Sequence, residues 1–319
     1  MSEITIGRVT VKPGQRQRLE LPVGRLYTQT PMSLPIQVVN GREDGPRLWV
    51  SAAIHGDELN GVEIISRLLE KVSPKRLKGL LIAVPIVNVF GFIQQDRYLP
   101  DRRDLNRSFP GSSAGSLAGR LAHLFMEEVV SHCTHGIDLH TASNHRINLP
   151  QIRCNLKDPE TRRIAEAFAA PLMMDSSGPR GSLRHAATQK KIPILVYEAG
   201  EPLRFNPEAI AVGFRGLMNV MHELGMLKAR RKQWRSSMEV SRTIWIRARR
   251  GGILRLKAKL GRRVDKGQAL GVIHDAYGQE KAEVTSPHSG LIIGHTNNPL
   301  VNQGDGIIHM TRELRARAT

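Results

Sequence analysis

Short apolar runs alternate with helical periodicity through the first two-thirds of the chain, and this alternation limits the fold more than any other feature. The runs are rich in Val, Ile and Leu, and each is bounded by Gly, Pro or polar residues. They cover Leu48–Ile54, Leu80–Val89, Gly136–Leu139 and Ile192–Val196. Runs of this kind are typical of strands buried inside a sheet. Strands that alternate with helices predict an α/β domain whose mainly parallel or mixed central sheet is flanked by helices.

Helices are predicted between these strands by periodicity and by signals at their ends. Leu59–Val72 has helical spacing and stops before Pro74. Two more helices are predicted to follow Asp158-Pro159-Glu160 and Asn206-Pro207-Glu208. Each of these tripeptides joins a capping side chain to a proline that suits the first helical turn.

The character of the sequence changes after Gly225. Met226–Ser241 is polar and basic, as expected for a linker, and the rest of the chain has short strand-like runs separated by glycines. The runs cover Thr243–Ala248, Gly252–Leu256, Ala269–Ile273, Lys281–Thr285, Gly290–Ile293 and Gly306–Met310. This spacing predicts a small all-β barrel or sandwich. We therefore predict two domains, covering residues 1–235 with the linker and residues 236–319.

The chain carries a formal net charge of +18, and much of this charge lies in one segment. Residues 228–263 contain 14 Lys or Arg and a single acid, Glu239. The segment is either a solvated basic surface or a surface that attracts anions, such as an acidic substrate, nucleic acid or an anionic lipid surface. Aromatic residues make up only 4% of the chain, which disfavours base stacking and hence nucleic acid as a partner.

The cysteine count and the hydropathy pattern bear on the compartment. Cys133 and Cys154 are too few for a disulfide framework, which favours a reducing environment. The first residues lack an apolar signal core, and no run of about 18 apolar residues occurs. We therefore expect a cytoplasmic protein without a membrane partner.

Three potential metal ligands lie at the ends of predicted strands. Leu48–Ile54 leads into His55-Gly56-Asp57-Glu58, and the strand Gly136–Leu139 ends at His140. Ligands in parallel α/β sheets usually lie outside the carboxyl ends of the strands. A lone His at a strand end is more often a structural polar residue, but two His and one Glu together form the ligand set of a catalytic zinc. Asp138 is placed to orient a ligand imidazole.

Four motifs together resemble the succinylglutamate desuccinylase/aspartoacylase family of the zinc carboxypeptidase clan, over about residues 45–225. They are His55-Gly56-Asp57-Glu58, Asp104-Leu105-Asn106-Arg107, Asp138-Leu139-His140 and Tyr197-Glu198-Ala199-Gly200, in the order of the family. The resemblance implies a zinc carboxypeptidase-like fold and one zinc ion per chain, held by His55, Glu58 and His140. It also implies that Glu198 activates a water molecule and then protonates the leaving amine. From its position alone, Glu198 could equally be a helix cap.

The polar segment Asp96–Gly111 is the candidate substrate-binding loop, although a solvated loop with internal salt bridges would have the same composition. In the family, an Asn-Arg pair that matches Asn106 and Arg107 grips the substrate carboxylate. A guanidinium fits a carboxylate through two hydrogen bonds, and an amide adds a neutral donor.

A further family arginine precedes that pair and polarises the scissile carbonyl. Arg97 is our first choice for this role and Arg103 is the alternative, with Arg102 also open. The ambiguity arises because two extra residues separate Arg97 from the Asn-Arg pair, compared with the family pattern. Residues that contact the acyl half of the substrate are sought in Ser143–Arg146 and Ser176–Arg184.

Gly261–Gly271 and the segment around Gly290 resemble the biotinyl/lipoyl barrel. The expected hairpin, His274–Lys281, lacks the usual context of a modified lysine, so Lys281 is not expected to carry biotin or lipoate. An extra β domain is also a feature of the family. We expect this domain to pack on the catalytic domain, to shape its entrance or to form a subunit interface in a homo-oligomer.

The sequence therefore predicts zinc-dependent hydrolysis of an amide bond in a small N-acylated amino acid or a related carboxylate-bearing compound. A carboxypeptidase that acts on short peptides is the nearest alternative enzyme. A non-enzymatic protein that binds anions or nucleic acid on the same scaffold is the alternative from another class. The basic segment favours the binding protein, whereas the intact ligand set and Glu198 favour an enzyme.

Overall fold

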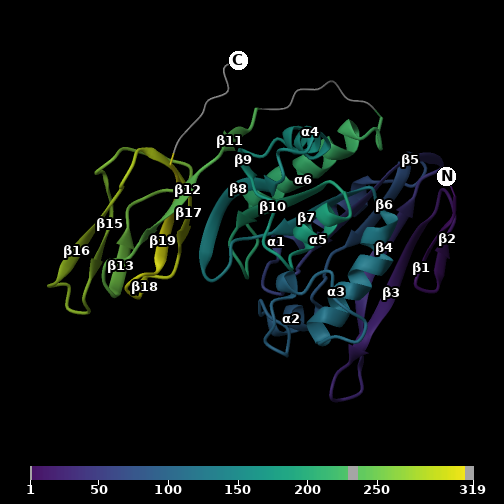
Figure 1. Ribbon diagram of the computed structural model, residues 1–319, viewed down its shortest axis with the longest axis horizontal. Coiled ribbons are helices and arrows are strands. Elements are labelled where there is room, and N and C mark those ends of the chain that lie inside the picture. The colour runs from purple at the N-terminus through teal and green to yellow at the C-terminus, as the bar shows by residue number, and fades with distance from the viewer. Residues whose placement is uncertain (1, 229–235, 313–319) are drawn as a thin grey trace.

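The computed structural model describes residues 2–228 and 236–312 (Figure 1). A large sheet with helices on both faces forms most of the molecule, and a β structure made by the C-terminal part of the chain stands at one end of it. The predicted fold class, a mixed central sheet flanked by helices with a small all-β part, is confirmed. Within the described residues, no helix is both long and apolar enough to span a membrane.

The centre of the large sheet is parallel and its flanks are antiparallel. The parallel strands, in spatial order, are β6 (Lys78–Val84), β5 (Glu43–Ala52), β7 (His135–His140) and β10 (Ile194–Gly200). The antiparallel flanks are β4 (Pro31–Asn40) and β3 (Arg16–Arg25) beside β6, and β8 (Arg146–Cys154) beside β10. Shorter strands are β9 (Leu172–Asp175) and β11 (Met238–Val240) beyond β8, and the separate hairpin of β1 (Ile4–Ile6) and β2 (Val9–Val11).

Helices cover both faces of this sheet, and each face has its own apolar core. One face carries α1 (Asn60–Lys71), α4 (Pro159–Phe168) and α6 (Pro207–Glu223). The other carries α2 (Val89–Gln94), α3 (Leu117–Glu128) and α5 (Leu183–Gln189). Short 3-10 helices cover Leu105–Arg107 and Val130–His132. Because full burial of a Leu or Ile side chain contributes about 1.5–3 kcal/mol, two such cores hold the strand ends firmly in place.

Two helices begin where their capping residues predicted. The Asp158 carboxylate accepts a hydrogen bond from the N–H of Thr161 (2.8 Å), and the Asn206 amide oxygen accepts one from the N–H of Ala209 (3.0 Å). A proline occupies the first turn of both helices, α4 and α6. These bonds satisfy backbone donors that have no partner inside the helix.

One predicted strand is shorter than expected. The apolar run Leu80–Val89 contributes a strand only as far as Val84, where β6 ends. The next residue, Pro85, has no N–H to donate to a neighbouring strand, and α2 begins four residues later. The apolar pattern continues because both the strand and the helix bury their side chains.

The C-terminal part is an antiparallel β sandwich without a helix among residues 236–312. One layer contains β12 (Thr243–Arg247), β19 (Gly306–Thr311), β17 (Gly290–Thr296) and β14 (Arg263–Val264). The facing layer contains β16 (Lys281–Thr285), β15 (Ala269–His274), β13 (Gly252–Leu256) and β18 (Leu300–Val301). A third apolar core, which includes Ile273 and Ile308, lies between the layers.

The first layer of the sandwich continues the large sheet. Strand β17 pairs with β8, with Gly294 opposite Asn148, so the strands of both parts form one hydrogen-bonded sheet. The predicted domain boundary near residue 236 adjoins residues 229–235, which lie outside the described residues together with part of the basic linker. That boundary stays a prediction.

Candidate active site

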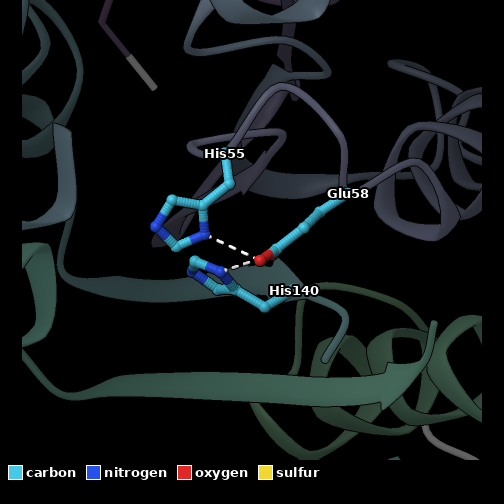
Figure 2. A group of neighbouring side chains, drawn as sticks. All are labelled: His55, Glu58 and His140. Atoms are coloured by element: carbon cyan, nitrogen blue, oxygen red, sulfur yellow. Dashed lines mark hydrogen bonds and ion pairs between the residues drawn. The ribbon is translucent and has the colours of Figure 1, made fainter. Parts of the chain in front are cut away.

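Figure 2 shows that the three predicted metal ligands meet at one point. His140 is the last residue of β7, and His55 and Glu58 lie in the turn between β5 and α1. The parallel pairing of β5 with β7 brings these strand ends side by side. Atoms that can bind a metal on the three residues all lie within 4.8 Å of one another, and all three side chains are buried.

The Glu58 carboxylate lies between the two imidazoles. Its Oε1 is 2.8 Å from His55 Nδ1, and its Oε2 is 2.8 Å from His140 Nδ1. Burial alone would raise the pKa of Glu58, but the adjacent charges of His55 and His140 hold it below its ordinary value. A carboxylate that stays ionised beside two imidazoles is a donor set suited to zinc.

The Nε2 atoms of both imidazoles also have carboxylate partners. His140 Nε2 is 2.7 Å from Asp138 Oδ2, and Ser51 Oγ donates to the other oxygen of that carboxylate (2.8 Å). His55 Nε2 is 3.2 Å from Asp104 Oδ1. Partners of this kind fix the orientation of metal-binding imidazoles, so the arrangement fits a divalent metal ion with both Nδ1 atoms facing it. Asp138 occupies the orienting position that the sequence predicted.

The sequence offered three arginines that could polarise the scissile carbonyl. Of these, only Arg97 lies beside the metal ligands among the described residues. Its Nη2 donates to Asp104 Oδ2 (2.8 Å), and its Nη1 is 3.5 Å from Glu58 Oε1. The Arg103 side chain is 63% exposed, pairs with Asp101 at 3.6 Å and does not line the cavity at this site. Arg102 is exposed as well. The structure therefore brings Arg97 to the ligands and leaves Arg103 outside.

Asn106 and Arg107 line the same cavity, which has a volume of about 500 Å³. They lie in a 3-10 helix that Asp104 caps by accepting from the N–H of Asn106 (2.8 Å). The Asn106 amide oxygen accepts from the N–H of Leu183 (2.9 Å), which leaves the amide NH₂ as the donor for a ligand. Arg107 Nη1 donates to the backbone oxygen of Asn106 (2.7 Å).

Glu198 lines the cavity from inside β10 rather than after it. The register of β10 with β7 places Glu198 beside His140. Its Oε2 accepts from Asn148 Nδ2 (2.9 Å) and is 3.3 Å from Arg153 Nη2. The helix-cap alternative is wrong, because Asn206 caps the helix that follows.

Other charged and aromatic residues also line the cavity. Arg146 and Arg184 lie in the two segments that the sequence singled out for the acyl half of the substrate. The sequence analysis missed Arg153, Trp245 and His309. Arg153 lies among buried residues of β8, and a charged residue in such a stretch is a signal that could have pointed to it. Trp245 and His309 belong to the C-terminal sandwich, and no local signal connects them with the cavity.

Comparisons with known proteins agree with this geometry. Residues 44–224 match the model of the succinylglutamate desuccinylase/aspartoacylase catalytic domain. The chain is 26% identical over 289 residues to the N-alpha-acetyl-L-2,4-diaminobutyric acid deacetylase of Halomonas elongata, which covers 86% of this chain and 84% of that protein.

Two further relatives extend the comparison. A succinylglutamate desuccinylase of Pseudomonas aeruginosa is 30% identical over 144 residues, 41% of this chain and 42% of that protein. The crystal structure of a succinylglutamate desuccinylase/aspartoacylase from Rhodobacter sphaeroides is 25% identical and superposes with a TM-score of 0.84, over 94% of this chain and 96% of that one. The chain belongs to the succinylglutamate desuccinylase/aspartoacylase family.

Proposed function

We propose that this protein is a zinc-dependent deacylase that hydrolyses the amide bond of a small N-acylated amino acid or a related carboxylate-bearing compound. The proposal is carried by one observation. His55, Glu58 and His140 converge in a cavity that also contains Glu198 and the Asn106–Arg107 pair. The names of the Halomonas and Pseudomonas relatives describe removal of an acetyl and a succinyl group, which supports a deacylating reaction.

One zinc ion held by His55, Glu58 and His140 would supply a Lewis acid for the scissile carbonyl and promote the ionisation of water near neutral pH. Glu198 would take the proton of the attacking water and return it to the leaving amine, a role supported by its place in the same cavity and opposite His140 in the sheet. Its contact with Asn148 keeps one carboxylate oxygen in a fixed place.

Positive donors complete the proposed mechanism. Arg97 is held by Asp104 and stabilises the negative charge that develops on the carbonyl oxygen. Arg107 and the amide of Asn106 bind a substrate carboxylate and so place the amide bond near Glu198. The cavity is lined by both the large sheet and the sandwich, and its volume of about 500 Å³ favours a small molecule over a peptide chain.

We also propose that the protein works in the cytoplasm. Cys133 and Cys154 are both free thiols and both are buried. Burial raises the pKa of the Cys154 thiol to about 12, which keeps it protonated and unreactive. Free, unreactive thiols suit a reducing compartment.

Hydrolysis by the zinc-loaded protein tests the proposal directly. The protein is incubated with a panel of N-acetyl and N-succinyl amino acids, and release of the free amine is followed by chromatography. We expect release that stops after the metal is removed by a chelator and returns when zinc is added. A zinc-loaded protein that releases no amine from any member of the panel would contradict the proposed function.

A further inference from the structure

Two donors from β8 hold the same oxygen of Glu198. Asn148 Nδ2 donates to Glu198 Oε2 (2.9 Å), and Arg153 Nη2 lies 3.3 Å from that oxygen. Among the described residues, no contact to the other oxygen, Oε1, is present. Gln151 pairs with Glu198 in the sheet, but its buried amide has no hydrogen-bond partner in the part of the chain that the structure describes. Asn148 and Arg153 thus fix Oε2 and leave Oε1 to take a proton.

Asn148 lies at the junction between the large sheet and the C-terminal sandwich. On one side it pairs with Gly200 at the end of β10, and on the other side it pairs with Gly294 of β17. Its side chain is buried between these strands. The residue that donates to Glu198 is therefore itself in contact with the sandwich, and a change in β17 reaches Glu198 through a single side chain.

Gly294 leaves the space that the Asn148 amide occupies. A Cβ atom at residue 294 would lie 2.8 Å from Asn148 Oδ1 and 3.1 Å from the backbone oxygen of Ile147. Because nonbonded atoms pack at about 3.5–4.0 Å, a methyl group there would displace the flexible end of Asn148 first. The backbone of Gly294 is outside the left-handed region, so its conformation alone would accept an alanine. The obstacle to a side chain at residue 294 is therefore the Asn148 amide.

The loop after β17 holds the segments on either side of this contact. The N–H of Asn297 donates to the backbone oxygen of His145 (2.7 Å), and the Asn297 side chain donates to Glu201. His145 precedes β8 and has a left-handed backbone (φ 56°), a conformation that costs a residue with a side chain about 1–3 kcal/mol and needs neighbours to hold it. Glu201 directly follows β10. The sandwich thus holds the start of one strand and the end of the other, the two strands that carry Asn148 and Glu198.

We propose that Asn148 is a positioning residue for Glu198 and that Gly294 of the sandwich sets the place of Asn148. The inference rests on the proposed function, because it gives both residues a part in the proton transfer assigned to Glu198. The sandwich then does more than line the cavity, since the missing side chain at residue 294 lets Asn148 reach Oε2. Loss of a hydrogen bond to a charged group corresponds to a factor of about 10 to 100.

A double-mutant cycle in the zinc-loaded protein tests this series of contacts. Gly294→Ala and Asn148→Ala should each lower kcat about 10- to 100-fold, with zinc content unchanged and KM changed less than about twofold. In Asn148→Ala the nearest obstacle to a methyl group at residue 294 is gone, so adding Gly294→Ala should lower kcat no further. Losses that multiply in the double variant would indicate two independent structural roles and would overturn the proposal.

Gly251→Ala is the matched control in the same sandwich. A Cβ atom at Gly251 would lie 3.5 Å from its nearest neighbour, the backbone oxygen of Val301, and the backbone of Gly251 is not left-handed. Its kcat should therefore stay within about twofold of the wild-type value. An equal loss in Gly251→Ala and Gly294→Ala would contradict the proposal, because any methyl group added to the sandwich would then impair turnover.

Folding of the variants is also informative. If Gly294→Ala does not fold, the double variant with Asn148→Ala should fold again, because the clash is removed. Failure of both to fold would place the requirement for glycine elsewhere and would overturn the role of Asn148. Circular dichroism and zinc content measure folding in each case.

Crystal structures distinguish failure of this inference from failure of the proposed function. In the wild-type protein we expect Asn148 Nδ2 within hydrogen-bond distance of Glu198 Oε2, and in Gly294→Ala a separation beyond about 3.5 Å. If no amide is cleaved but the contact is lost in Gly294→Ala, the hydrolase proposal fails and the control of Glu198 by Gly294 stands. If amides are cleaved and the contact persists in Gly294→Ala, the function stands and the inference fails.

Discussion

The two ends of the cavity differ in how completely their polar groups are paired. At the metal end, defined here by His55, Glu58 and His140, each imidazole nitrogen and both carboxylate oxygens have a partner within about a hydrogen-bond length. The arginine end consists of three arginines that line the cavity, Arg146, Arg153 and Arg184. Each of their guanidinium groups has at least one buried donor without an acceptor among the described residues. The first end therefore has its polar groups paired within the protein, whereas the second keeps donors without acceptors.

This difference follows from how each end is built. The metal end comes from adjacent parallel strands and one tight turn, and its outer partners Asp138 and Asp104 lie in the same domain. The arginine end combines β8 and the start of α5 with Trp245 and His309 from the C-terminal sandwich. We therefore expect changes at the metal end to alter metal content or kcat, and changes at the arginine end to leave metal content unchanged.

The largest effect is expected from His140→Ala. The substitution removes one of three ligands and leaves the Asp138 carboxylate without its imidazole, so zinc content should fall to near zero and hydrolysis to the uncatalysed rate. Elemental analysis and amine release measure the two quantities. His135→Ala on the same strand is the control, because His135 pairs with Glu160 away from the site. Full zinc occupancy in His140→Ala would break the assignment of the metal end.

Glu198→Gln should separate metal binding from proton transfer. The amide keeps the shape of the side chain but cannot take a proton from water, so kcat should fall by about 10²- to 10⁴-fold at unchanged zinc content. Single-turnover kinetics and elemental analysis on the same sample measure both. Asn148→Asp, which replaces the donor to Glu198 with a second carboxylate, should disturb the same step without removing the base. Near-normal turnover in Glu198→Gln would remove Glu198 from the role of general base.

Arg97 and Arg103 provide a comparison between a largely buried and an exposed guanidinium. Arg97→Gln should lower kcat by about 10²- to 10³-fold, because the donor beside Glu58 no longer stabilises the developing charge. Arg103→Gln should change kcat less than twofold, since this side chain lies outside the cavity. Steady-state kinetics on one substrate decide between them. A larger loss in Arg103→Gln than in Arg97→Gln would reverse the assignment.

The metal end could be predicted from sequence because its ligands adjoin recognisable strands. His140 closes a short buried run, and His55 and Glu58 follow another, so rules for parallel sheets placed them at one edge. The predicted strand ended at Val196, before Glu198, whereas β10 continues to Gly200 and therefore contains Glu198. The alternation of Leu34, Ile36 and Val38 in β4 was a usable strand signal that the sequence analysis did not take up.

The arginine end was only partly predictable. Arg146 and Arg184 were inside candidate segments, but their unpaired donors become evident only when the neighbouring strands are in place. Trp245 reaches the cavity because β17 pairs with β8 and carries the sandwich with it. No local pattern records a pairing between strands about 150 residues apart, because residue spacing specifies strands and turns but not which distant edges join.

Among substitutions of residues that line the cavity, the smallest effect is expected from Arg107→Lys, which keeps the positive charge but loses the planar pair of donors. Because a lysine meets a carboxylate through a single ammonium, KM should rise about tenfold for every N-acyl amino acid, with zinc content and kcat unchanged. The same rise for N-acetyl and N-succinyl substrates would place Arg107 at the carboxylate they share. Unchanged KM for all substrates would remove Arg107 from substrate binding.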